Sequence, residues 1–194
     1  MTKQELIDFE KDIETHFLKG EIRAPIHLSS GNEDKLISIF KDIKDSDWCF
    51  SNHRSHLHAL LHGIPADWLK EQILLGRSMH INSKKYKFMT SSIVNGCVPI
   101  AVGMAMALKR QKSPDKVWCF VGDMASSVGV FYENAKYTAR QDLPITFIVE
   151  DNGLSTNTPT LEAWGDCALP ENILRYYYER GCPHINVGKW VTFS

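Results

Sequence analysis

The chain has 194 residues, 43% of them hydrophobic, which is enough to bury the core of one α/β domain. Its 22 basic and 23 acidic residues give a formal net charge of −1, so the composition excludes the basic surface expected of a protein that binds nucleic acid or an acidic membrane. No apolar run approaches the roughly 20 residues that cross a bilayer. We therefore expect a single domain over residues 1–194 that binds neither nucleic acid nor membrane.

The first half of the chain is predicted to be mainly helical. Apolar residues spaced at the helical period indicate helices over residues 3–19, 32–43, 54–61 and 65–75. Asn32 is expected to cap the second of these helices, Gly63 to end the third and Pro65 to open the fourth. Residues 76–97 are rich in Gly, Ser, Asn and Lys, which predicts a loop. After Pro99, the run AVGMAMALKR predicts a helix of small residues that can lie close to a sheet or to another subunit.

Two buried parallel strands joined by a helix are predicted in the second half. The runs VWCFV (117–121) and ITFIV (145–149) are rich in β-branched and aromatic residues. Between them the spacing is helical, with one face formed by Val130, Phe131, Asn134, Ala135 and Thr138. From Pro170 onward, ILRYYYER favours a strand, and so do HINV and KWVTF after a Gly-Cys-Pro turn. The pattern predicts an α/β fold with a mostly parallel sheet flanked by helices.

One oxygen-bearing side chain stands at the end of each of these two strands. Asp123, after Gly122, follows the first strand, and Asn152 follows the second. Ligands of open α/β sheets bind at this edge, and a carboxylate with an amide carbonyl suits Mg²⁺, which often bridges to phosphates. A helix beginning near Ser126 would direct free N–H groups at the same place. We predict a metal–diphosphate site; the alternative is a plain strand-end turn at Asp123 and a cap at Asn152.

The segment from Gly122 to Asn152 resembles the thiamine-diphosphate signature, in which Gly-Asp-Gly is followed by about thirty residues and Asn. The resemblance extends to the alpha subunit of the first component of 2-oxo acid dehydrogenase complexes. That family has the patterns HL..G.E, YR.H..ALA.G, GGSMH, GIVGAQVPLA.G.A.A.K and GDGA…ENN.Y. The corresponding segments here are KGEIRAPIHLSSGNED (19–34), SNHRSHLHALLHGIP (51–65), GRSMHIN (76–82), SSIVNGCVPIAVGMAMALKR (91–110) and the signature itself. The resemblance covers roughly residues 15–165 and implies a three-layer thiamine-diphosphate-binding fold with a small-molecule substrate.

The resemblance implies contacts with the diphosphate and with the reactive end of the cofactor. His53-Arg54 stands where the family has Tyr-Arg, whose arginine grips the diphosphate, and a guanidinium fork suits phosphate oxygens. A surface ion pair is the alternative for Arg54. His27, in the matching His-Leu pair, would face the thiazolium ring and is the catalytic candidate, because an imidazole moves protons near neutral pH. A half-buried structural histidine is the alternative there.

Further residues are implied to bind the aminopyrimidine ring and the metal. Ser92 and Val94 lie in the segment whose backbone carbonyl accepts from the exocyclic amine and whose hydrophobic side chain bends the cofactor. The signature implies Mg²⁺ or Ca²⁺ held by the side chains of Asp123 and Asn152 and by the backbone carbonyl of Leu154. The cofactor-binding residues expected in total are His53, Arg54, Ser92, Val94, Gly122, Asp123, Met124, Ala125, Asn152 and Leu154.

Ser92 and Met124 depart from the family pattern, and one histidine cluster needs an explanation. Ser92 replaces a glycine, which leaves a backbone carbonyl contact intact. Met124 also replaces a glycine, and its N–H stays available to a diphosphate provided that its φ is negative. The cluster His53, His56, His58 and His62 lacks the spacing of known zinc sites, so the helix-face and cofactor interpretations explain it better. His80 is expected to order its loop.

The resemblance also predicts a partner chain. Thiamine enzymes use a glutamate beside the aminopyrimidine ring, and in the resembled family it lies on a beta subunit. We therefore expect a beta-type subunit to supply the catalytic glutamate, in an assembly of two copies of each chain. The helix Ala101–Ala107 would lie near a subunit interface, with Met104 and Met106 as adaptable contacts.

Three functions remain open at the sequence level. The first is decarboxylation of a 2-oxo acid, or cleavage of a ketose, with transfer of the aldehyde or acyl fragment to a carrier. The second is a transketolase-like or acyloin-forming carboligase without lipoyl coupling, favoured because residues 166–194 do not resemble the family's continuation and the sequence ends at Ser194 as in a truncated member. The third is a degenerate structural or regulatory subunit, suggested by Ser92 and Met124.

Cysteine usage and the N-terminal segment predict a cytoplasmic protein. Five cysteines, an odd number without a C-x-x-C pair, sit mostly in apolar contexts, which favours reduced thiols. The start, MTKQELIDFEKDIE, is acidic and amphipathic, unlike a targeting segment.

Overall fold

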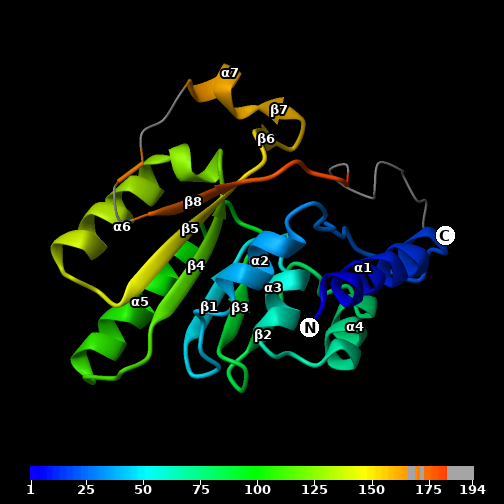
Figure 1. Cartoon of the computed structure of the whole chain (residues 1–194), viewed down its shortest axis with the longest axis horizontal. Helices are drawn as coiled ribbons and strands as arrows, with labels where there is room; N and C mark the ends of the chain where they lie inside the picture. The colour runs from blue at the N-terminus through cyan, green and yellow to red at the C-terminus, as the bar shows by residue number, and fades with distance from the viewer. Residues whose placement is uncertain (166–168, 171–172, 183–194) are drawn as a thin grey trace.

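The computed structural model describes residues 1–165, 169–170 and 173–182, and it has an α/β architecture (Figure 1). A six-stranded sheet has the order β2-β3-β1-β4-β5-β8. Its strands are β1 (Trp48–Ser51), β2 (Asn82–Ser83), β3 (Phe88–Thr90), β4 (Val117–Gly122), β5 (Ile145–Asp151) and β8 (Leu174–Tyr177). Every pair of neighbours is parallel except β2 and β3. The predicted α/β fold with a mostly parallel sheet is therefore confirmed.

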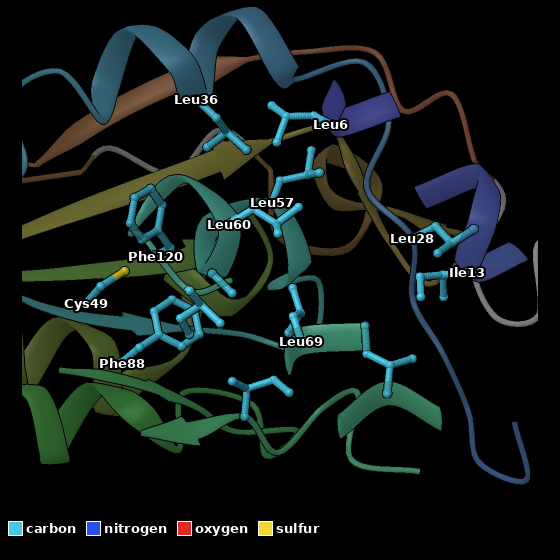
Figure 2. Packing of buried hydrophobic residues seen from close by; sticks show 14 of the residues in the cluster. Leu6, Ile13, Leu28, Leu36, Cys49, Leu57, Leu60, Leu69, Phe88 and Phe120 are labelled. Carbon is cyan, nitrogen blue, oxygen red and sulfur yellow. The ribbon is translucent and has the colours of Figure 1, made fainter. Parts of the chain in front are cut away.

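Helices cover both faces of the sheet, which makes three layers (Figure 1). One face packs against α1 (Lys3–Leu18), α2 (Glu33–Ile39), α3 (His56–Leu61) and α4 (Ala66–Leu74). The other packs against α5 (Cys97–Arg110) and α6 (Gly129–Arg140). Alternation along the strands divides the core: Trp118 and Phe120 of β4 face the first group of helices, whereas Cys119 faces the second. Figure 2 shows Phe120 with Cys49 and Phe88 in the first of these two cores.

The chain order of the strands places a ligand-binding crevice beside β1. From β1 the chain passes through α3 and α4 to β3 on one side, and α5 then carries it to β4 on the other side. The sheet continues outward through α6 to β5. Open α/β sheets bind ligands at the carboxyl ends of strands where the order reverses in this way. Here the reversal lies between β1 and β4, and the segments that leave these two strands carry Arg54 and Asp123.

The predicted helices and the two central strands are confirmed, with three local differences. The helix predicted over residues 32–43 is shorter, because α2 ends at Ile39. Asn32 precedes α2 as expected, but its side chain makes no capping hydrogen bond; its Nδ2 donates instead to Glu150 (3.4 Å) and Tyr176 (3.1 Å). In α6, Phe131 is buried but Val130 is exposed. Val130 belongs to the first turn of the helix and does not lie on the face that packs against the sheet.

The prediction of a continuous loop over residues 76–97 is wrong. Phe88–Thr90 forms β3, which pairs in parallel with β1, and Phe88 is fully buried. The strand β1 has four residues and β3 has three, which is too few for the sequence to show the period of a strand. Their conformation is therefore decided by pairing within the sheet. The strand expected after Pro170 is confirmed as β8, whereas HINV and KWVTF lie outside the described residues.

The elements after β5 stand at the carboxyl end of the sheet (Figure 1). They are β6 (Leu154–Ser155), β7 (Thr158–Pro159) and the short helix α7 (Thr160–Trp164). A 3₁₀ turn, η1 (Ala125–Ser127), separates β4 from α6. The four cysteines in the described part of the chain are free thiols; the fifth, Cys167, lies outside it. Within the same part, no helix is both long and apolar enough to cross a membrane.

Candidate functional site

A cavity of about 440 Å³ lies at the carboxyl ends of β1, β4 and β5. Segments that are far apart in the sequence form its walls: residues 51–54, 91–98, 120–125 and 150–156, with His27 and Tyr178. Every residue that the sequence analysis assigned to the site lines this one cavity: His27, His53, Arg54, Ser92, Val94, Gly122, Asp123, Met124, Ala125, Asn152 and Leu154. The structure therefore brings the candidate residues together.

Asp123 places a buried carboxylate at the end of β4. It is 5% exposed, and its Oδ2 accepts a hydrogen bond from the hydroxyl of Thr160, the first residue of α7. Burial raises the pKa of Asp123 above its ordinary value of 3.8 and the nearby Asp151 raises it further, while the Thr160 hydrogen bond acts against both. A buried anion of this kind is stabilised by a cation, so the carboxylate suits a metal ion.

Asn152 follows β5, and its side-chain amide is held at both ends. Its Oδ1 accepts from the backbone N–H of Leu154 at 3.0 Å. Its Nδ2 donates to the hydroxyl of Tyr178, also at 3.0 Å. Asp123, Asn152 and the Leu154 backbone all line the cavity, so oxygen donors suited to Mg²⁺ or Ca²⁺ are present along this wall.

Arg54 brings a positive charge to the cavity from the turn after β1. Its Nη1 donates to the carbonyl of Leu28 at 2.8 Å, and its backbone N–H donates to Asn52 Oδ1 at 2.7 Å. Burial lowers the pKa of Arg54 from its ordinary value of 12.5, but a guanidinium remains charged at neutral pH. Arg54 lines the cavity, and a guanidinium is a charged multiple donor that suits an anion.

Two histidines lie together in the cavity wall. The rings of His27 and His53 pack edge to face, with centroids 4.7 Å apart. His27 is buried and comes from the segment before α2, whereas His53 belongs to the same turn as Arg54. Their contact joins two segments whose proximity the sequence could not reveal.

The loop before α5 forms another wall and holds a buried polar group. Ile93 and Val94 are exposed, at 73% and 68%, while the next residue, Asn95, is buried. Asn95 has a φ of +56°, and its Nδ2 donates to the carbonyl of Ala125 at 2.7 Å. Its Oδ1 is buried without a hydrogen-bond partner in the described part of the chain. Gly96 permits this tight loop, because a Cβ there would lie 2.6 Å from the Ser91 hydroxyl.

The turn after β4 leaves room for a ligand. A Cβ built on Gly122 meets no atom within 4 Å, and Gly122 lines the cavity. Met124 has φ −68° and ψ −32°, so the condition of a negative φ at this position is confirmed. The helix expected to begin near Ser126 starts as η1, and α6 itself begins at Gly129 after Val128, which also lines the cavity.

Glu150 forms a polar floor that the sequence analysis did not identify. It is 6% exposed and receives hydrogen bonds from four side chains: Asn32 (3.4 Å), Asn52 (3.0 Å), His58 (3.1 Å) and Tyr176 (2.6 Å). Burial acts to raise the pKa of Glu150, but the charge of His58 and these hydrogen bonds outweigh it and hold the pKa below 4.5. The only signal in the sequence was an acidic residue at the end of an apolar strand.

The clustered histidines use their ring nitrogens for separate partners. His56 contacts Glu10 (2.7 Å) and Ser78 (2.8 Å), whereas His58 contacts Ser51 (2.6 Å) and Glu150. Across residues 1–165, 169–170 and 173–182, no group of three or more His, Cys, Asp or Glu side chains is arranged to hold a metal ion. The helix-face interpretation therefore accounts for His56 and His58, and zinc finds no support.

The fold and the cavity together define an α/β protein that can hold an anionic ligand and a hard cation at a topological switch point. The chain belongs to the family described as Dehydrogenase E1 component, which it matches over residues 1–165. The family resemblance drawn from the ordered motifs is thereby confirmed.

Curated relatives support this assignment. The alpha subunit of the acetoin:2,6-dichlorophenolindophenol oxidoreductase of Bacillus subtilis (strain 168) is 30% identical over 165 residues, which cover 80% of this chain and 50% of the relative. The subunit of the same name from Cupriavidus necator is 30% identical over 161 residues, covering 78% and 48%. The pyruvate dehydrogenase E1 component subunit alpha of Porphyra purpurea is 29% identical over 162 residues, covering 75% and 47%. The chain thus spans about half the length of the curated relatives it matches.

Proposed function

We propose that the chain is the alpha-type subunit of a two-chain thiamine-diphosphate-dependent enzyme. It would decarboxylate a 2-oxo acid, or cleave a related ketone, and transfer the resulting aldehyde or acyl fragment. The observation that carries the proposal is the single cavity in which Arg54, Asp123 and Asn152 meet at the switch point of the sheet. The family match, which ends at residue 165, includes all three residues.

The residues at one end of the cavity fit the diphosphate of the cofactor and its metal ion. Arg54 would pair with phosphate oxygens, and the metal would be held by the side chains of Asp123 and Asn152 and the carbonyl of Leu154. Open space in front of Gly122 leaves room for the diphosphate against the backbone, and the N–H groups of Met124 and Ala125 would lie alongside it. The burial of Asp123 supports a cation at this end, because burial raises the pKa of the carboxyl and a cation would favour its charged form.

The residues at the other end of the cavity fit the aminopyrimidine and thiazolium rings of the cofactor. The unsatisfied Oδ1 of Asn95 is an acceptor suited to an N–H donor such as an exocyclic amine. Ser92 would offer a backbone carbonyl and Val94 an apolar surface to the aminopyrimidine. When bound, thiamine diphosphate supplies a nucleophilic ring carbon that can break the bond next to a ketone carbonyl. His27, supported by the ring of His53, is the residue of this chain placed to hold or move a proton near that carbon.

A partner chain is needed to complete the chemistry. The two carboxylates among the described cavity residues are Asp123 and Glu150. Asp123 is assigned to the metal, and Glu150 is held by four donors, so neither can serve as the glutamate beside the aminopyrimidine. The apolar rim of Ile93 and Val94 suits coverage by a second protein. We therefore infer a beta-type partner that supplies the glutamate, in an assembly with two copies of each chain.

The substrate class is proposed from the names of the relatives. Their names specify acetoin and pyruvate, a 2-hydroxy ketone and a 2-oxo acid. Both compounds contain a ketone carbonyl, the group on which the chemistry supplied by thiamine diphosphate would act. A carboligase that passes the fragment to a free aldehyde is the second candidate, because the segment after residue 165 lies outside the family match and shapes the cavity through Tyr178. A cytoplasmic location remains part of the proposal.

The experiment combines the chain with its beta-type partner, Mg²⁺ and thiamine diphosphate, and supplies pyruvate or acetoin with an artificial electron acceptor. A parallel reaction replaces the electron acceptor with an aldehyde, and product analysis then separates oxidation from carboligation. We expect turnover only in the presence of both chains. Absence of cofactor binding by the mixture would refute the enzyme proposal and favour a structural subunit, whereas turnover by this chain alone would refute the role of the partner.

A further inference from the structure

A segment beyond the family match, the strand β8 and the residue after it, brings Tyr178 to the cavity. β8 pairs in parallel with β5, with Tyr176 opposite Glu150 and Tyr177 opposite Asp151. The following residue, Tyr178, lines the cavity and donates its backbone N–H to the Asp151 carbonyl at 2.9 Å. The family match ends at residue 165, so this wall of the site is a feature of this chain that the family assignment does not explain.

Tyr178 acts on the amide of Asn152. The backbone N–H of Leu154 can only donate, so the end of the amide that faces it is the carbonyl oxygen, Oδ1. The amino end, Nδ2, therefore points to the oxygen of Tyr178, which accepts at 3.0 Å. The amide is thus fixed at both ends, in one of the two orientations that its shape permits.

We propose that Tyr178 is a positioning residue that fixes the orientation of the Asn152 amide for binding of the metal–diphosphate. The inference rests on the proposed function, because Asn152 is taken as a metal ligand. If the amide group rotates by about 180°, it presents its N–H₂ group, which repels a cation, in place of its carbonyl oxygen. Tyr178 provides the acceptor that the amino group occupies, and so keeps the carbonyl oxygen available on the other side.

The size of the effect follows from the loss of one hydrogen bond between neutral groups. Such a bond changes an equilibrium by about 3- to 10-fold. The Tyr178→Phe variant keeps the ring and removes only the acceptor, so the packing of Tyr178 against Tyr176, with ring centroids 5.8 Å apart, is retained. Tyr177→Phe is a matched control, because Tyr177 lies on the same strand but is exposed and its hydroxyl is not part of the cavity.

The test measures binding of Mg²⁺ by calorimetry at a fixed, saturating concentration of thiamine diphosphate, using the 194-residue chain with its partner. We expect Tyr178→Phe to weaken Mg²⁺ binding by about 3- to 10-fold and Tyr177→Phe to leave it unchanged. Melting temperatures of the ligand-free proteins should agree. A large fall in the melting temperature of Tyr178→Phe would indicate a structural role and overturn the inference.

A double-mutant cycle separates positioning from other roles. In an Asn152→Ala background the amide is absent, so Tyr178→Phe should cause no further loss of Mg²⁺ affinity. An equal loss in both backgrounds would mean that Tyr178 acts by another route and would overturn the inference. If the unsubstituted protein binds no Mg²⁺ with thiamine diphosphate, the proposed function fails. If it binds and Tyr178→Phe binds equally well, only the inference about Tyr178 fails.

Discussion

Replacing Glu150 by Gln tests the polar floor of the cavity without changing its shape. The carboxylate accepts from Asn52 at one oxygen, and from Asn32, His58 and Tyr176 at the other. A glutamine keeps one acceptor oxygen but places an N–H₂ group where the second oxygen was. If that group faces Asn52, two donors meet at a position where the present distance is 3.0 Å.

The expected loss of stability has two parts. A buried donor without an acceptor costs about 1–3 kcal/mol, and the loss of charge in the bond to His58 removes roughly 1 kcal/mol more. Together they predict a decrease of about 2–4 kcal/mol in the free energy of unfolding. For a chain of this size each kcal/mol lowers the melting temperature by roughly 2–4 °C, so the shift should fall between about 4 and 16 °C.

The same prediction has a pH dependence with a definite sign. The pKa of Glu150 is lower in the fold than its ordinary value of 4.5, so its charge stabilises the fold above that pH. The stabilisation is lost as the pH falls through the folded pKa. Urea unfolding of the unsubstituted chain and of Glu150→Gln should therefore differ most at neutral pH and converge as the pH falls through the lowered pKa of Glu150. Glu133→Gln, at an exposed position on α6, is the control. If the free energies of unfolding of the unsubstituted chain and of Glu150→Gln differ by less than about 1 kcal/mol at pH 7, the four hydrogen bonds to Glu150 do not stabilise the fold as described.

The remaining predictions concern the proposed site and its assembly. Asp123→Ala should abolish turnover while circular dichroism shows an intact fold; near-normal turnover would exclude the metal assignment. Arg54→Ala should raise the cofactor concentration for half-maximal activity by roughly 10- to 100-fold with a small change in maximal rate, and an unchanged requirement would leave Arg54 a structural residue. Gly103→Leu should prevent assembly with the partner in light scattering, while the isolated chain keeps its melting temperature, since a Cβ at Gly103 meets no atom within 4 Å.

The central unit of the fold could be predicted because its signals are local. β4 and β5, of six and seven residues, contain the runs VWCFV and ITFIV, and the helix between them has a clear period. Asp123 and Asn152 follow from these strands, because parallel strands end at the same edge of the sheet. The remaining candidate residues came from ordered motifs, which carried His27 and Arg54 into the same cavity although the sequence does not show their distance.

What could not be predicted depends on contacts between distant segments. β3 has only three residues and exists because it pairs with β1. Asn32 has the composition of a helix cap, but the buried carboxylate of Glu150 offers a charged partner, and the amide turns to it. Tyr178 belongs to a segment without a motif, so its place beside Asn152 follows only from the pairing of β8 with β5.

The departures from the family pattern do not require a degenerate subunit. Met124 replaces a glycine, but its φ of −68° is ordinary for a residue with a side chain, so the backbone N–H remains available. Asn95 also stands where the family pattern has a glycine, and its φ of +56° is a conformation that asparagine adopts more readily than most residues. Its side chain then ties the loop to Ala125 in the turn after Asp123. Both residues adopt backbone conformations that their types tolerate, and Asn95 adds a bond between two walls of the cavity, as expected if the site is retained for binding.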